Sequence, residues 1–151
     1  MKVYKFGGAS VKDASGVRNL KEIVACAGDD LMVVISAMGK TTNALERVVA
    51  ALAQKDEATA DNEWLAVLDY HVHLAMELGL KPNEDIRFPM MPEYDHTCSY
   101  DQNYDQIVSQ GEILSTQIVA VYLLKSGIRT EWWNMPKLLR TDNTFREAQV
   151  D

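Results

Sequence analysis

The first eleven residues constrain the fold of this chain more than any other stretch, because they combine a strand with a glycine turn. Val3, Tyr4 and Phe6 form a short apolar segment, and Gly7-Gly8 follows it directly. Paired glycines permit a tight turn and the close approach of a ligand to the main chain, since neither carries a Cβ atom. This stretch therefore predicts a buried strand, a tight turn and the start of a helix.

The residues around the turn favour a phosphate-binding site. Lys5 places a positive charge directly before the glycines, and Ser10 is a suitable N-cap for the helix expected to follow. The free N–H groups and positive dipole end of a helix N-terminus attract anions. Lys5, Gly7, Gly8 and Ser10 are therefore candidate phosphate ligands. The alternative is an ordinary strand-to-helix connection with a surface lysine, which is common for so short a motif.

The next stretch, residues 12–35, predicts an α/β fold. Apolar residues recur at helical spacing over residues about 12–27, and Gly28 is placed to end this helix. Residues 31–35 then form a continuous apolar run, which is typical of a parallel strand buried on both faces. The order strand, helix, strand indicates an α/β fold with right-handed crossovers.

A hydroxyl-rich loop follows the second strand. Gly39-Lys40-Thr41 is similar to the end of a P-loop, but the full pattern requires a glycine at position 34, which is a valine here. The P-loop interpretation is therefore disfavoured. In a doubly wound sheet, ligands bind at the carboxyl ends of the strands. The hydroxyl and amide side chains of this loop are then either helix caps or ligand-binding groups: Ser36, Thr41, Thr42 and Asn43.

The rest of the chain predicts further helices and two more strands. Helices are expected over residues about 59–78 and 103–126, joined by an irregular segment over 81–102 that contains three prolines. A third strand is expected over 128–133 and a short fourth strand over 138–141.

Gly111 and Glu112 stand out within the second of these helices. A glycine inside a helix costs about 1 kcal/mol relative to alanine, so it usually indicates a close approach by a ligand or a neighbouring element. Glu112 would then face the same crowded region. The alternative is a close helix–sheet contact beside a solvated glutamate.

The histidines and cysteines do not predict a metal site. His71 and His73 are two residues apart, so they point to different faces of a helix. His96 and Cys98 have no second ligand pair nearby in the sequence. Cys26 and Cys98 are expected to be free thiols in a reducing cytoplasm.

Length and charge exclude several classes of protein. A chain of 151 residues is long enough for one domain with a core. A formal net charge of -7 argues against a nucleic-acid binder, which usually has a basic face. No apolar run approaches about 18 residues and no signal peptide is evident, so neither membrane insertion nor secretion is expected. A cytoplasmic protein is predicted.

Three motifs resemble the signatures of the aspartate kinases, within the amino acid kinase superfamily. V-Y-K-F-G-G-A-S-V is similar to the family opening K-F-G-G-T-S-V, although Ala9 replaces the usual threonine. S-A-M-G-K-T-T-N is similar to the second family motif, and S-Q-G-E-I-L-S to the third. Three motifs in the family order are far more specific than any one of them.

The resemblance implies a fold, a reaction and roles for particular residues. The expected fold is a three-layer αβα sandwich with a mainly parallel central sheet, of which residues 1–151 would form the N-terminal half. The implied reaction transfers the γ-phosphoryl group of ATP, with Mg²⁺, to the β-carboxylate of aspartate, a step towards lysine, threonine and methionine. Lys5 would be catalytic; Lys5, Gly7, Gly8, Ser10 and Ser36 would bind phosphate, and Thr42 and Glu112 would bind aspartate.

The resemblance also indicates what this chain lacks. The family's R-G-G-S-D-like loop and its regulatory ACT domains have no counterpart here. We therefore expect part of a catalytic domain, in a protein that forms homo-oligomers. Two alternatives remain open: another member of the superfamily, or a non-catalytic fragment that self-associates through exposed apolar surface.

Overall fold

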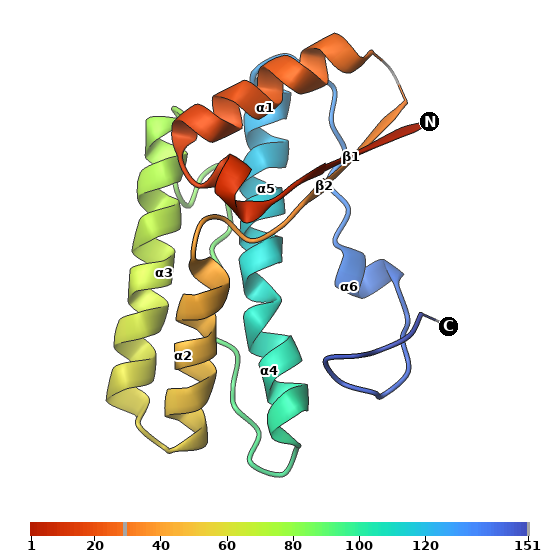
Figure 1. The fold of residues 1–151 in the computed structure, drawn as a ribbon. Helices are drawn as coiled ribbons and strands as arrows, with labels where there is room; N and C mark the ends of the chain where they lie inside the picture. The colour runs from red at the N-terminus through yellow and green to blue at the C-terminus, as the bar shows by residue number, and fades with distance from the viewer. Residues whose placement is uncertain (29, 151) are drawn as a thin grey trace.

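The computed structural model describes residues 1–28 and 30–150, and it has the expected α/β character (Figure 1). In chain order the elements are β1 (Lys2–Phe6), the 3₁₀-helix η1 (Gly8–Val11), α1 (Ala14–Ala27), β2 (Leu31–Ile35), α2 (Thr41–Ala53), α3 (Glu57–Glu77), α4 (Tyr100–Val108), α5 (Gln110–Lys125) and α6 (Met135–Leu138). Strand β1, helix α1 and strand β2 form the predicted strand–helix–strand unit.

The two strands pair in parallel, with Lys2 opposite Leu31 and Phe6 opposite Ile35. The sheet face that packs against the helical core carries Phe6, Leu31, Val33 and Ile35. The other face carries Val3 and Val34, which are 57% and 44% exposed. The prediction that the second strand is buried on both faces is therefore wrong for the described residues.

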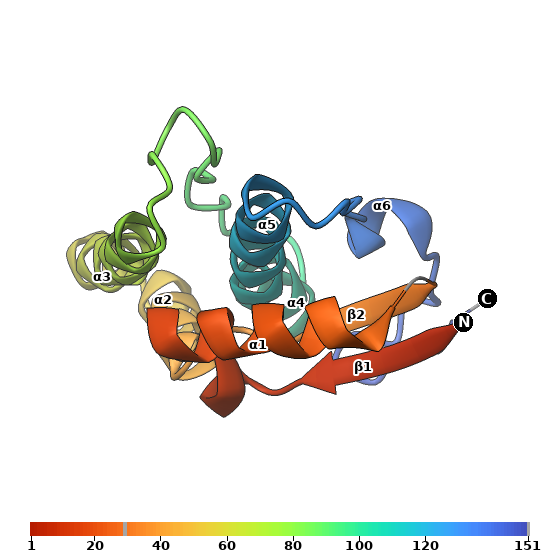
Figure 2. The same ribbon diagram turned by 90° about the horizontal axis from the view of Figure 1, so that it is seen from above.

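The helices enclose the core on one side of the sheet. Helices α2 and α3 and the pair α4–α5 run side by side as a bundle, and α1 crosses one end of it (Figures 1 and 2). One apolar cluster joins the buried sides of α1, α3 and α5 to Ile35 of β2, and a second joins α2, α3, α4 and the start of α5. Gly28 ends α1 with a positive φ of 79°, as its sequence position predicts.

The expected third and fourth strands are absent from the described residues. Residues 128–133 have no regular structure, and the residues before Leu139 form the short helix α6. A strand requires a neighbour to satisfy its backbone groups. Here the segment instead runs beside α5, where the Trp132 indole donates a hydrogen bond of 3.0 Å to Thr116 Oγ1.

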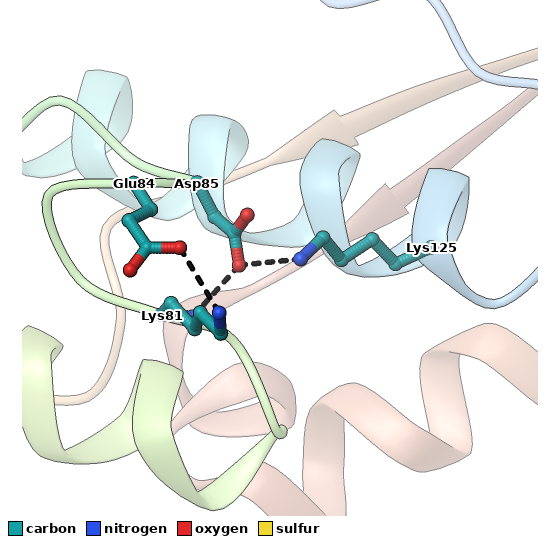
Figure 3. A network of polar contacts seen from close by, with 4 residues as sticks. All are labelled: Lys81, Glu84, Asp85 and Lys125. Carbon is teal, nitrogen blue, oxygen red and sulfur yellow. Dashed lines mark hydrogen bonds and ion pairs between the residues drawn. The ribbon is translucent and has the colours of Figure 1, made fainter.

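The irregular segment between α3 and α4 is held in place by charged contacts (Figure 3). Asp85 accepts hydrogen bonds from the Lys81 main-chain N–H at 2.7 Å and from Lys125 Nζ at 2.6 Å. Lys81 Nζ also pairs with Glu84 at 3.1 Å. These bonds hold the pKa of Asp85 below its ordinary value, with the Lys125 contact as the largest cause. The segment after α3 is thereby fastened to the end of α5.

The expected long helix over 103–126 consists of two helices. Helix α4 ends at Val108, Ser109 forms a turn, and α5 begins at Gln110. By length and composition alone, the combined helical stretch Tyr100–Lys125 is apolar enough to cross a membrane, so the expectation of no membrane insertion stays a prediction. Of its most apolar window, 44% is buried inside the protein, and one such helix is weak evidence for a span because the core helix of a soluble protein passes the same test.

Candidate functional site

The loops that follow β1 and β2 are bonded to each other at the carboxyl ends of the strands. The Ser36 N–H donates to the Phe6 carbonyl at 3.1 Å, and the Gly39 N–H donates to the Gly8 carbonyl at 3.0 Å. The glycine turn and the hydroxyl-rich loop, which the sequence predicted at one edge of the sheet, therefore lie together. This is the edge where parallel α/β folds bind ligands.

The two glycines of the turn have different surroundings. A Cβ atom built on Gly8 would lie 2.3 Å from the Ala37 carbonyl oxygen, closer than any real contact. The absent side chain of Gly8 thus permits the two loops to approach. A Cβ atom on Gly7 would meet nothing within 4 Å. Gly7 therefore borders open space, where its main chain is accessible to a ligand.

Lys5 lies on the exposed face of the sheet. Its side chain shares that face with Val3 and Val34, as the alternation of a strand requires. It forms no ion pair with any acidic side chain in the described part of the chain. Its charge is therefore available to an anion that approaches from this side.

Ser10 is not a helix cap, which corrects the prediction from the sequence. It lies inside η1, and its N–H donates to the Gly7 carbonyl at 2.9 Å. Helix α1 is capped instead by Asp13, whose carboxylate accepts from the Gly16 N–H at 2.8 Å. A Cβ on Gly16 would lie 2.3 Å from the Ser10 carbonyl oxygen, so this glycine lets η1 pack onto α1. The signal for this cap in the sequence was Asp13 itself, since aspartate is among the residue types preferred at N-caps.

Two adjacent threonines begin α2 and have different environments. Thr41 is buried, and its hydroxyl donates to the Met38 carbonyl at 2.7 Å. Thr41 is therefore the structural hydroxyl of this loop. Thr42 is half-buried in the first turn of α2. Its position beside the loop contact leaves it as the candidate for binding a ligand.

Helix α5 presses its first turn against the loop after β2. A Cβ on Gly111 would lie 2.9 Å from Ala37 Cβ and 3.1 Å from Thr41 Cγ2. The predicted close approach at Gly111 is confirmed, and the neighbour is this loop. Glu112 is half-buried, and its Oε1 accepts from the Ala37 N–H at 3.2 Å. The alternative of a solvated glutamate is therefore wrong.

Two further lysines, which the sequence analysis did not select, flank the same loops. Lys12 follows η1, and a Cβ built on Gly39 would lie 3.7 Å from Lys12 Cβ. Lys40 is the residue before α2 and is exposed. Together with Lys5, they place positive charge around the edge of a protein whose net charge is -7. A local attraction for anions is thus compatible with the acidic composition.

The described residues contain no group of three or more histidine, cysteine, aspartate or glutamate side chains that could hold a metal ion. His71 is buried, with Nδ1 2.7 Å from the Val67 carbonyl oxygen, and burial lowers its pKa. His73 lies on the exposed face of α3, 3.4 Å from Asp69. The two histidines therefore lie on different faces, as predicted.

A separate depression of about 470 Å³ lies beside the charged contacts of Figure 3. It is lined by Asn83, Glu84, Asp85, Ile86, Arg87, Phe88 and Gln117. None of these residues belongs to the two loops that follow β1 and β2, residues 7–11 and 36–40, hereafter the strand-edge loops. The depression is therefore distinct from the candidate site.

Comparisons with known proteins identify the family. The family model described as the amino acid kinase family matches residues 1–149. The chain belongs to the amino acid kinase family. It is 28% identical to lysine-sensitive aspartokinase 3 of Escherichia coli over 99% of this chain, and 30% identical to chloroplastic aspartokinase 2 of Arabidopsis thaliana over 98% of it. Those matches cover 34% and 29% of the two relatives, so the chain spans about a third of their length.

Solved structures agree with this assignment. The structure of E. coli aspartokinase III in complex with aspartate and ADP superimposes with a TM-score of 0.83 at 25% identity. The match covers all of this chain and 35% of the other. A second structure of aspartokinase III, with lysine and aspartate, has a TM-score of 0.77 at 21% identity and supports the fold alone. The predicted amino acid kinase fold is confirmed, and the described residues contribute a two-stranded part of its sheet.

Proposed function

We propose that this chain carries part of an aspartate kinase site, for the ATP-dependent phosphorylation of the β-carboxylate of L-aspartate to 4-phospho-L-aspartate. One observation carries the proposal: the glycine turn, the start of α2 and the start of α5 converge at one strand edge. The bonds from Gly39 to Gly8 and from Ala37 to Glu112 join these three elements. Each element contributes one of the three motifs that resemble the aspartate kinases.

The phosphate side of this site is assigned to the residues around the glycine turn. A carboxylate is already a nucleophile, so the reaction requires no strong base. The barrier lies in bringing two anions together and stabilising charge on the transferring oxygens. Lys5 forms no ion pair among the described residues, and Gly7 has an open main chain. We assign Lys5 the catalytic role, and Gly7, Gly8, Ser10 and Ser36 the binding of phosphate oxygens.

The aspartate side is assigned to Thr42 and Glu112. The Glu112 carboxylate has one oxygen on the Ala37 N–H, which fixes its orientation and leaves the other oxygen for an ammonium group. A charge-assisted hydrogen bond to that ammonium is about twice as strong as a neutral one. Aspartate is also named in the complex of the similar E. coli enzyme.

The described residues do not offer a carboxylate cluster for magnesium. Mg²⁺ keeps several waters and often binds through substrate phosphates, where it neutralises their charge. We therefore expect the ion to arrive with ATP rather than to occupy a site made by these residues. The roles of Lys5, Thr42 and Glu112 do not depend on it.

The test is to measure the binding of Mg·ATP and of aspartate to this chain, by calorimetry and by the changes in amide NMR shifts. Mg·ATP should shift the signals of residues 7–11 and 36–40, and aspartate should shift those of Thr42 and Glu112. Lys5→Ala should weaken Mg·ATP and leave aspartate unchanged, whereas Glu112→Gln should do the reverse. Lys137→Ala, in α6, is a matched control that should change neither.

Two results would count against the proposal. Shifts confined to residues 83–88 would place binding at the separate depression instead. Equal affinities for Lys5→Ala and the parent chain would make Lys5 an ordinary surface residue. A coupled assay for ADP release in the presence of aspartate shows in addition whether this part of the site supports turnover by itself.

A second candidate function is self-association without catalysis. The observation in its favour is the exposed sheet face, where Val3 and Val34 remain accessible to water. Apolar residues on an open sheet favour contact with a second chain. Sedimentation velocity across a hundredfold range of concentration tests this candidate. A concentration-dependent dimer that Val34→Lys abolishes would support it, and a monomer at every concentration would reject it.

A further inference from the structure

Helix α3 contacts the candidate site through the side chain of Tyr70. The Tyr70 hydroxyl donates a hydrogen bond of 2.5 Å to the Lys12 carbonyl, directly after η1. A Cβ atom built on Gly39 would lie 3.0 Å from the same hydroxyl oxygen and 3.7 Å from ring atom Cζ. Tyr70 therefore contacts the chain that follows the glycine turn and also covers the loop that follows β2.

The contact with Gly39 matters because this residue has an unusual conformation. Its φ of 57° lies in the left-handed region, which side chains other than glycine rarely adopt. Its N–H donates to the Gly8 carbonyl at 3.0 Å and so joins the two loops. Tyr70 lies over the residue at which this connection is made.

The tyrosine is carried by a rigid element. Helix α3 has 21 residues, and its buried side packs into both apolar clusters. The Tyr70 ring is half-buried and stands edge-on to buried His71, with 4.9 Å between the ring centroids. A side chain fixed in this way restrains whatever it contacts, because its own rotamer freedom is limited by packing.

We propose that Tyr70 is a positioning residue that holds the glycine turn and the loop after β2 together, and thereby sets the affinity of the site for the phosphates of ATP. The phosphate part of this inference rests on the proposed function. The contact of Tyr70 with both loops does not. Tyr70 lies outside all three motifs that resemble the aspartate kinases.

The first experiment compares Tyr70→Phe with the parent chain. Amide hydrogen exchange should become about three- to tenfold faster at Gly39 and at Ser10. The Gly39 N–H donates to the Gly8 carbonyl and joins the two loops, and the Ser10 N–H donates to the Gly7 carbonyl within the glycine turn. This range corresponds to one hydrogen bond worth roughly 0.5–1.5 kcal/mol. The dissociation constant for Mg·ATP should rise by a similar factor, and the constant for aspartate should stay the same.

Tyr104→Phe is the matched control. Its hydroxyl also makes one hydrogen bond, to Glu46 at 2.7 Å, but it touches neither loop. Tyr104→Phe should leave exchange at Gly39 and Ser10 unchanged, as well as the affinity for Mg·ATP. A general loss of stability from removing one tyrosine hydroxyl would affect both variants alike.

The two readouts separate this inference from the proposed function. Unchanged exchange at Gly39 and Ser10 in Tyr70→Phe would overturn the positioning role. Faster exchange with unchanged Mg·ATP affinity would overturn the link to phosphate binding. If the parent chain binds no Mg·ATP, the proposed function and the phosphate part fail together, while faster exchange would still support the positioning of the loops.

A second experiment tests the contact itself. Gly39→Ala should lower the urea midpoint of unfolding, because the new Cβ meets the Tyr70 hydroxyl and the backbone is left-handed. In the Tyr70→Phe background, Gly39→Ala should lower the midpoint less than in the parent chain. The backbone strain at residue 39 is the same in both backgrounds, but the clash of the new Cβ with the tyrosine hydroxyl is absent from Tyr70→Phe. Equal decreases in the two backgrounds would show that Tyr70 does not press on Gly39.

Discussion

The strand-edge loops and the segment from Ile128 to Val150 differ in what holds their conformation. The loops are bonded to each other through the main chain, and they bury Ala37, Met38 and Thr41 between the helices. The C-terminal segment exposes large apolar side chains instead: Trp133 is 52% and Leu138 is 60% exposed. Close backbone contacts determine the first region, whereas the second follows the surface of α4 and α5.

The few contacts of the C-terminal segment are mostly polar. The Arg146 N–H donates to Asp105 at 2.8 Å, and its guanidinium lies 4.2 Å from the centroid of the Tyr104 ring. Exposed contacts of this kind contribute little, about 0.5–1 kcal/mol each. The sequence motifs therefore lie where main-chain contacts constrain the conformation most. Substitutions there should lower the free energy of unfolding more than substitutions in the C-terminal segment.

The largest difference is expected between the two glycines of the turn. Gly8→Ala should destabilise the chain by about 3 kcal/mol, because its Cβ would collide with the Ala37 carbonyl and the loops would separate. Gly7→Ala should change stability by less than about 0.5 kcal/mol, since its Cβ enters open space. Urea unfolding of both variants checks this. Similar losses would mean that the loops are not packed as closely as described.

A smaller loss is expected where α5 meets the loop after β2. Gly111→Ala adds a Cβ 2.9 Å from Ala37 Cβ, which overpacks the contact, but alanine also favours the helix by about 1 kcal/mol. We expect a net destabilisation of about 1 kcal/mol by urea unfolding. Gly7→Ala, whose Cβ meets nothing within 4 Å and whose φ of -75° suits any residue, serves as a control for the added methyl group alone. A stabilised Gly111→Ala variant would contradict the close contact.

The buried histidine of α3, His71, should make the stability of the chain sensitive to acid. Burial lowers the pKa of His71 in the folded chain, while the unfolded chain keeps a value near 6.5. Above this pH both states are neutral. As the pH falls below about 6.5, the unfolded state binds a proton first, so stability decreases until the folded pKa is passed. His71→Leu should therefore lose less stability between pH 7 and 5 than the parent chain.

The comparison of the histidines supplies the control for this prediction. His73 is exposed on the same helix, beside Asp69. His73→Gln removes an exposed imidazole from the same helix, and its urea midpoints at each pH are the reference against which those of His71→Leu are compared. An unchanged pH dependence in His71→Leu would show that water reaches His71 Nε2, which has no hydrogen-bond partner among the described residues.

The smallest effect is expected in the C-terminal segment. Arg146→Ala removes the contact with the Tyr104 ring and the ion pair with Asp101, which has an N–O distance of 3.4 Å. The free energy of unfolding should fall by less than about 1 kcal/mol, since both contacts are exposed. The loss should shrink at high salt. A loss as large as that of Gly8→Ala would show that this segment stabilises the fold as strongly as the loops do.

Periodicity and motif chemistry predicted the parts of the fold that are locally determined. The strand–helix–strand unit, the stop at Gly28 and the irregular segment after α3 were all found. The same reasoning failed over 128–133 and 138–141, where two strands were predicted and none is found. Strand formation depends on a partner strand, which propensity does not reveal. It also failed to distinguish Asp13 from Ser10 as the cap of α1, because both residue types cap helices well.

The sequence by itself determined which residues are candidates for the site and that Gly111 requires a close neighbour. Only the tertiary structure decided that this neighbour is the loop after β2, that Thr41 is buried while Thr42 is not, and that Tyr70 covers Gly39. The physical reason is distance along the chain. Local patterns report backbone conformation and apolar faces, whereas the hydrogen bonds that assemble the site join residues 30 to 75 positions apart, from Ser36–Phe6 to Ala37–Glu112.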